Sequence, residues 1–382
     1  MEIITVGKPA VNIYINLVEF PQDGDVFRIN KKIESLGNAS ATSACLLAKW
    51  GLHVNFCGSV GNDAYNEQIQ NAFKELKINT KYLETDYEGG SAVNHMIINN
   101  QTKNITKILY SSDTSAIKRF KFDFQPDWAV FDGTDVQATL GVINTNPELK
   151  SVFYLNTINK EINNIAKKCT WIVTNQNYAV NMTKATIDGS AESYVSLYQQ
   201  LVDVNGQSNY IILLNNHKIL YVEDGKVKML PDLQFVVEDN SSFDSVFTGA
   251  FTFAQAMGLS LDESIKFGNT AASISLSVIG EVPSIPELQV VMDNSGLGDK
   301  IIEAKNRMSE ENYQKTQTQA PAKPKLGQAF SNNQTEQNVA PAVAAPTEVS
   351  ATPQQETPKV NIPTPNVEAA TQAVASNNSQ NV

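Results

Sequence analysis

An α/β fold, with helices on both faces of a mostly parallel central sheet, is predicted by the order of apolar and polar segments in this 382-residue chain. From residue 128 onward, short apolar runs of buried-strand type alternate with helical stretches, which is the pattern of βαβ units. The apolar runs are 129–131, 152–155, 171–173 and 210–214, and the helical stretches include 159–168 and 191–202. A polar loop before a small-residue helix, at 239–251, adds a candidate ligand site at the sheet edge.

The N-terminal part of the chain predicts strands at 2–6, 11–18 and 54–60. A helix rich in alanine and serine is expected at 37–49, between the second and the third strand. These short side chains allow the helix to lie close to a sheet. The first strand begins almost at the N-terminus, which lacks the basic and apolar pattern of a signal peptide.

The next segment predicts a capped helix and then a hairpin. Asp63 can accept backbone hydrogen bonds at the start of a helix whose Ile69 and Phe73 lie on one apolar face. Strands are expected at 89–98 and 105–110, joined by a short polar loop. These two strands form a hairpin that is separate from the βαβ part of the chain.

The stretch at 239–251 predicts an anion site. The apolar run 235–237 is expected to be a strand that leads into the polar loop, and a helix is expected from about Val246 to Met257. A helix N-terminus presents unpaired N–H groups and the positive end of the helix dipole, which together attract phosphate or carboxylate groups.

Composition limits the classes of partner. The chain carries 29 lysines and arginines against 40 aspartates and glutamates, a net charge of −11, which argues against a nucleic-acid surface or a polybasic membrane patch. The three cysteines and three histidines show no metal-ligand spacing, so no metal site is expected from them. No apolar run approaches the length of a membrane span. We therefore predict a cytoplasmic protein that binds neither nucleic acid nor a membrane.

The C-terminal part changes in composition. A polar helix is expected within 298–315. Beyond it, 316–382 is rich in proline, glutamine, asparagine and alanine, and eight of the fifteen prolines follow residue 320. Such a segment buries too little apolar area to offset its chain entropy, which predicts disorder. It is either a passive tail or a tail that binds a protein partner.

Three motifs occur in order along the chain. Residues 58–65 are Gly-Ser-Val-Gly-Asn-Asp-Ala-Tyr, residues 239–251 begin with Asp and end in Phe-Thr-Gly-Ala-Phe, and residues 268–273 are Gly-Asn-Thr-Ala-Ala-Ser. Together they resemble the signatures of ribokinase-like (PfkB-type) sugar and nucleoside kinases. The resemblance implies a ribokinase-like domain over 1–297.

The same resemblance implies an activity and an assembly. Its members transfer a phosphoryl group from ATP, with Mg²⁺, to a hydroxyl of a sugar or nucleoside. A small β lid, here approximately 11–33 and 88–110, covers the substrate and often forms a homodimer interface. The expected partners are therefore a small sugar or nucleoside and a second copy of the chain.

The resemblance also implies roles for individual positions. Substrate-binding positions are Asn12, Gly37, Asn38 and Thr42. Phosphate-loop positions are Asp239, Ser241 and Ser242, and nucleotide-binding positions are Asn175, Asn215 and Asn269. Ser245 stands at the position of the catalytic aspartate.

Several of these positions depart from the pattern of the family. Asn12 replaces an aspartate, Thr42 an asparagine and Tyr178 a glutamate, and 215–218 lack the glycines expected beside the nucleotide. Ser245 carries no carboxylate, and a serine hydroxyl is a weak base without a partner.

Two interpretations stay open. In one, the loop shifts by a residue and Asp244 becomes the base of a divergent kinase. In the other, which the combined departures favour, the chain is a weak or inactive kinase. Such a pseudokinase would act as a scaffolding or binding protein, through lid dimerisation and the tail.

Overall fold

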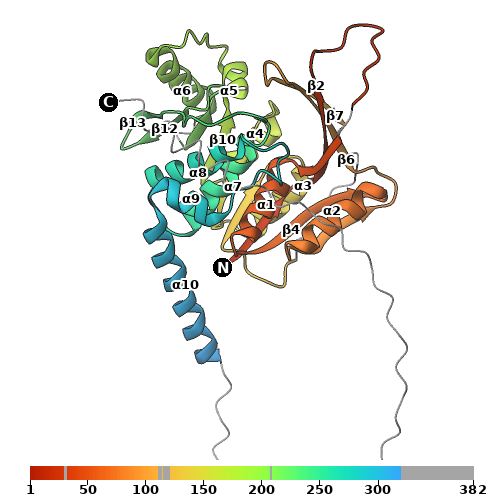
Figure 1. Ribbon diagram of the computed structural model, residues 1–382. Coiled ribbons are helices and arrows are strands. Elements are labelled where there is room, and N and C mark those ends of the chain that lie inside the picture. The colour runs from red at the N-terminus through yellow and green to blue at the C-terminus, as the bar shows by residue number, and fades with distance from the viewer. Residues whose placement is uncertain (30–31, 111–113, 115–120, 207–208, 320–382) are drawn as a thin grey trace, which may run out of the picture. The chain divides into compact units, whose positions relative to one another are not determined.

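The computed structural model describes residues 1–29, 32–110, 114, 121–206 and 209–319. Its main element is a nine-stranded sheet in the order β13-β12-β11-β10-β9-β8-β1-β4-β5. Figure 1 labels β4, β10, β12 and β13 of this sheet. The strands are β1 (Glu2–Val6), β4 (His53–Gly61), β5 (Asn79–Asp86), β8 (Trp128–Phe131), β9 (Lys150–Leu155), β10 (Trp171–Asn175), β11 (Tyr210–Leu213), β12 (Ile219–Glu223) and β13 (Lys226–Leu230). All neighbours from β5 to β11 are parallel, which confirms the mostly parallel sheet.

A smaller, four-stranded sheet has the order β3-β2-β6-β7. Its strands are β2 (Ala10–Leu17), β3 (Lys32–Gly37), β6 (Ala92–Asn99) and β7 (Ile105–Tyr110). The central pair, β2 and β6, is parallel, and the two outer pairs are antiparallel. Strands β6 and β7 and most of β2 lie within the segments predicted as a lid, 11–33 and 88–110, while most of β3 lies outside them. Strands β2, β6 and β7 lie together at the upper right of Figure 1.

Helices cover both faces of the large sheet, as predicted. They are α1 (Ala39–Lys49), α2 (Ala64–Glu75), α3 (Val136–Thr145), α4 (Lys160–Ala166), α5 (Gln176–Thr183), α6 (Ala191–Asn205), α7 (Phe243–Ala256), α8 (Leu261–Ser275), α9 (Leu288–Ser295) and α10 (Gly298–Gln319). Successive strand residues point to opposite faces, so Ile3 of β1 packs with α1, α7 and α8 while Ile4 packs with α3 to α6. Each face therefore has its own hydrophobic core.

Local signals placed several elements correctly. The Asp63 side chain accepts a hydrogen bond from the Asn66 backbone N–H at 3.0 Å, so it caps α2 as predicted. Ile69 and Phe73 of α2 are fully buried. Helix α10 extends through residue 319, so 316–319 are helical, and the rest of the predicted tail lies outside the described residues.

Two expectations differ from the structure. The run 235–237 is not a strand: Val236 is 64% exposed, and the sheet ends at β13, before this run. The hairpin β12–β13, which the sequence analysis missed, pairs antiparallel with β11 and occupies the sheet edge instead. Helix α7 also begins at Phe243, three residues before the predicted start. Within the described residues, no helix is long and apolar enough to cross a membrane.

Candidate functional site

A buried polar cluster lies where the small sheet meets the N-termini of α1 and α7. Its central group is the carboxylate of Glu281, in the segment that follows α8. Glu281 Oε1 accepts a hydrogen bond from Asn12 Nδ2 at 2.8 Å, and Oε2 accepts one from Thr42 Oγ1 at 2.6 Å. Ser245 supplies a further hydrogen bond. We call Asn12, Tyr14, Thr42, Ser245 and Glu281 the Glu281 cluster.

Burial dominates the electrostatics of this cluster. Burial raises the pKa of Glu281, while the hydrogen bond from Thr42 and the positive charge of Lys107 act in the opposite direction. Burial also raises the pKa of Tyr14, and the nearby Glu281 and Asp239 carboxylates raise it further. The tyrosine is therefore a neutral hydroxyl in this setting.

The strands of the small sheet hold Asn12 in one orientation. A Cβ atom built at Gly37 would lie 2.1 Å from Asn12 Nδ2, so only glycine leaves room for this amide. Asn94 of β6 donates from Nδ2 to Asn12 Oδ1 at 2.8 Å. Asn38 lies beside them and donates from Nδ2 to the Lys8 carbonyl oxygen at 2.7 Å. The predicted substrate-binding positions Asn12, Gly37 and Thr42 thus converge on one place.

Asp239 organises the loop before α7 rather than facing an open site. It is fully buried, and its carboxylate accepts hydrogen bonds from the backbone N–H groups of Ser241, at 2.8 Å, and Gly280, at 2.9 Å. The Ser241 hydroxyl lies 3.3 Å from Tyr14 Oη. The Ser242 hydroxyl bonds with that of Ser275 at 3.0 Å. The three predicted phosphate-loop side chains are therefore paired within the protein.

Asp244 belongs to a different group of residues. Its Oδ2 accepts a hydrogen bond from Tyr154 Oη at 2.6 Å and a longer one from Asn175 Nδ2 at 3.4 Å. Tyr154 and Asn175 stand on β9 and β10, on the large sheet. Burial, with the Asp244 charge beside it, raises the pKa of the Tyr154 hydroxyl well above its usual value. Asn175 also caps α5.

The remaining predicted nucleotide positions lie in turns and helices near β11 to β13. Asn215 is in the β11–β12 turn and donates its backbone N–H to Gln176 Oε1 at 3.1 Å. Asn269 is buried in α8 and donates from Nδ2 to the Pro231 carbonyl oxygen at 3.3 Å. The His217 ring, in the same turn as Asn215, packs 4.9 Å from the Phe243 ring.

The N-terminus of α7 carries Asp244 in its first turn, beside backbone N–H groups of the kind that receive phosphate oxygens. Among the residues that the structure describes, no group of three or more His, Cys, Asp and Glu side chains is arranged to hold a metal ion.

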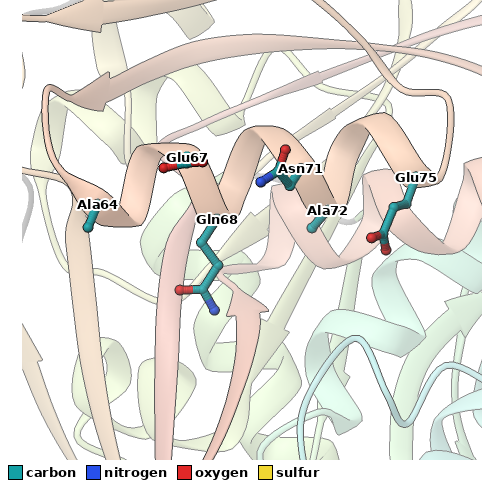
Figure 2. Close-up of a pocket in the computed structure, with 6 residues that line it drawn as sticks. All are labelled: Ala64, Glu67, Gln68, Asn71, Ala72 and Glu75. Atoms are coloured by element: carbon teal, nitrogen blue, oxygen red, sulfur yellow. The ribbon is translucent and has the colours of Figure 1, made fainter. Parts of the chain in front are cut away.

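A surface depression on α2 lies away from these groups. Figure 2 shows its lining side chains, which all come from this one helix: Ala64, Glu67, Gln68, Asn71, Ala72 and Glu75. Because one solvated helix face supplies the whole lining, the depression brings no groups from different elements together. The convergent polar groups of the Glu281 cluster make the stronger candidate site.

The sequence did not indicate Glu281 and Tyr14 of the Glu281 cluster, or Tyr154, the partner of Asp244. Glu281 lies between Gly280 and Pro283 in a short connecting segment, and nothing in its local sequence marks it as buried. An acidic residue that is 5% exposed is unusual and marks a functional or strongly paired group, but its burial cannot be seen in the sequence. Tyr14 and Tyr154 lie in β-rich runs and have the neighbours of ordinary strand residues.

Comparison with known proteins gives a consistent result. The family model described as pfkB family carbohydrate kinase matches residues 10–288. The ribokinase of Bacillus subtilis (strain 168) is 22% identical over 301 residues, covering 74% of this chain and 96% of that protein. The ribokinase of Haemophilus influenzae is 20% identical over 300 residues, covering 75% and 96%.

Solved structures confirm the ribokinase-like fold. Ribokinase from Cryptococcus neoformans in complex with ADP has a TM-score of 0.66 at 16% identity, covering 77% of this chain and 99% of that one. Arabidopsis thaliana ribokinase complexed with ribose and ATP has a TM-score of 0.64 at 16% identity, covering 77% and 98%. At these identities the likeness establishes the architecture and leaves the chemistry to the site residues.

Proposed function

Because this chain belongs to the pfkB family of carbohydrate kinases, we propose that it is a sugar or nucleoside kinase homologue with weak or absent phosphoryl transfer. The observation that carries the proposal is the side chain at position 245. A hydroxyl stands there, and it is hydrogen-bonded to the buried Glu281. A general base must lie within hydrogen-bond reach of the substrate hydroxyl and accept its proton, which a serine does poorly.

Asp244 is not well placed to take over. Its carboxylate is bonded to Tyr154 and Asn175 at the ends of β9 and β10. The substrate-position side chains Asn12 and Thr42 are bonded instead to Glu281. Asp244 would have to leave a 2.6 Å hydrogen bond with Tyr154 in order to act as the base. This arrangement favours weak activity over a divergent but efficient kinase.

ATP with Mg²⁺ is the cofactor that the family suggests, and we propose that the chain binds it weakly. Related ribokinases were solved with ADP or with ribose and ATP. Here a carboxylate stands at the α7 N-terminus, where the phosphate charge would have to be stabilised. We further propose that the protein is cytoplasmic, takes a small sugar or nucleoside, and binds neither nucleic acid nor a membrane.

Calorimetry with Mg-ATP and a coupled ADP-release assay with D-ribose test this proposal. We expect no saturable heat below millimolar nucleotide, and turnover far below the roughly 1–100 per second typical of kinases. Asp244→Asn should leave this residual rate unchanged, as should Asp203→Asn on the exposed face of α6, which serves as the control. If the native chain turns over in the normal range, and Asp244→Asn loses this activity while Asp203→Asn keeps it, the protein is a divergent kinase and the proposal is refuted.

A second candidate function is scaffolding through a lid homodimer. One observation favours it: large apolar side chains are exposed on or beside the small sheet, namely Val18, Phe20, Ile108, Leu109 and Tyr110. Such a group of exposed apolar residues is typical of a protein interface. A second copy of the chain would bury them, and the segment 316–382 could bind a further protein partner.

A further inference from the structure

We propose that the Glu281 carboxylate is an internal occupant of the sugar site, where it takes the hydrogen bonds that a sugar hydroxyl would otherwise make. The inference rests on the proposed function, because it takes the Glu281 cluster to be the sugar site. It goes further by assigning a residue that blocks this site in the native chain. Sugar binding then requires Glu281 to move away.

The position of the cluster is that of a ligand site. Open parallel sheets place ligands beyond the carboxyl ends of their strands, and helix N-termini add unpaired N–H groups there. The N-termini of α1 and α7 both reach this place, through Thr42 and Ser245. Asn12 arrives from the small sheet and Glu281 from the segment after α8. Four separate elements thus direct polar side chains at one point.

The hydrogen bonds show that a carboxylate fills that point. Both Glu281 oxygens are used, one by Asn12 at 2.8 Å and the other by Thr42 at 2.6 Å. An amide N–H and a threonine hydroxyl are the kinds of donor that also hold sugar hydroxyls. Each of the three side chains is at most 5% exposed, so Glu281 is their partner in place of water.

The backbone directs Glu281 into the cluster. Gly280 has φ of +103°, which an L side chain rarely adopts, so the turn before Glu281 depends on glycine. Asp239 accepts the Gly280 N–H at 2.9 Å, and Tyr14 Oη accepts the Glu281 N–H at 3.2 Å. The turn is thus fixed from two sides, and the inward direction of the side chain follows from the fold.

The negative charge of the Glu281 carboxylate determines which ligands it excludes from the cluster. Asp239 and Glu281 are two buried carboxylates within electrostatic range of each other, with Lys107 as a compensating charge. A second anion entering the cluster would meet both carboxylates, so anionic ligands are excluded by repulsion. A neutral sugar is excluded differently, since it must compete with Glu281 for Asn12 and Thr42. The apparent affinity for such a ligand is its affinity for the open site multiplied by the fraction of molecules in which the site is open.

Titration of D-ribose by calorimetry, with no nucleotide present, tests the proposal. The variants are Glu281→Ala, which removes the carboxylate, and Glu281→Asp, which draws it back by one methylene and keeps the charge. Glu287→Ala is the matched control, because Glu287 lies in the same segment with its side chain 71% exposed and paired with Lys49.

We expect Glu281→Ala to bind D-ribose at least tenfold more tightly than the native chain, Glu281→Asp to lie between them, and Glu287→Ala to match the native chain. If Glu281→Ala does not fold, an affinity gain of threefold or more in Glu281→Asp supports the proposal. Equal binding in all folded variants, or no binding in any, would overturn it. Because nucleotide is absent, these outcomes do not depend on whether the Mg-ATP experiment succeeds.

Discussion

Replacing Gly37 with alanine tests the geometry of the Glu281 cluster most directly. The new Cβ would lie 2.1 Å from Asn12 Nδ2 and 2.3 Å from Asn12 Cγ and Oδ1, far inside van der Waals contact. Asn12 cannot move aside easily, because it is 1% exposed and bonded to both Glu281 and Asn94. The mutation should therefore push the amide out of place and break at least one of these hydrogen bonds.

The expected cost follows from three contributions. Overpacking a tight interior costs about 1–3 kcal/mol. Losing the bond between Asn12 and the Glu281 carboxylate costs about 1.5–3 kcal/mol, the range for hydrogen bonds to charged groups. The reduced freedom of the unfolded chain on Gly→Ala returns about 0.4–1 kcal/mol. We expect the free energy of unfolding to fall by about 1.5–5.6 kcal/mol in total.

Urea unfolding followed by circular dichroism measures this change, with Gly298→Ala as the control. Gly298 opens α10, and a Cβ there would meet only ordinary contacts at 3.6 Å or more. Combining Gly37→Ala with Asn12→Ala should recover part of the loss, because the clash then has no partner. The close approach of Gly37 to Asn12 would be refuted by either of two results. One is a free energy of unfolding of Gly37→Ala within about 0.5 kcal/mol of that of the native chain. The other is a double mutant whose loss of stability equals the sum of the two single losses.

Two further predictions concern the lid and α2. Leu109 of β7 is 62% exposed, and Leu109→Lys should convert a homodimer to a monomer in light scattering. The control Val204→Lys, at a residue of α6 that is 53% exposed, should leave the dimer intact. A native chain that is already monomeric would contradict the lid dimer. Hydrogen bonds from Ser91 and Asn66 outweigh desolvation and lower the pKa of Asp63. Its contribution to stability is therefore present above its unfolded pKa of about 3.9 and is lost as pH falls through the folded value. In urea unfolding, Asp63→Ala should accordingly destabilise the chain by about 0.5–2 kcal/mol at pH 7 and by progressively less below about pH 4. An equal loss of stability at about pH 7 and below about pH 4 would contradict the role of the Asp63 carboxylate as a charged cap.

Local patterns predicted much of the fold. The apolar runs became the parallel strands β8 to β11, because a buried strand needs a short continuous run of apolar residues. Asp63 capped α2 because a cap depends only on neighbouring backbone N–H groups. The pattern failed at 235–237, where a β-branched run lies outside the sheet. Strand propensity reflects packing against neighbours, and this run has no strand beside it.

The sequence predicted which residues come together in the candidate site better than it predicted their hydrogen-bond partners. The family resemblance implied that Asn12, Gly37 and Thr42 share one substrate site, and the structure brings these residues together. The direction of Asp244 toward Tyr154 could not be inferred, since its partners on β9 and β10 lie 90 and 69 residues away. The same is true of Glu281, which is separated from Asn12 by 269 residues.

The amino-acid sequence by itself predicted the fold class and the resemblance to the family, and it determines the absence of a carboxylate at position 245, because these depend on residue identity and on neighbours in the sequence. The tertiary structure alone decided what fills the site. Whether Glu281 faces solvent or the Asn12 amide depends on the turn at Gly280 and on the packing of three other elements, β2, α1 and α7, around it. Such contacts form only when the chain folds, so residue order does not encode them in any local pattern.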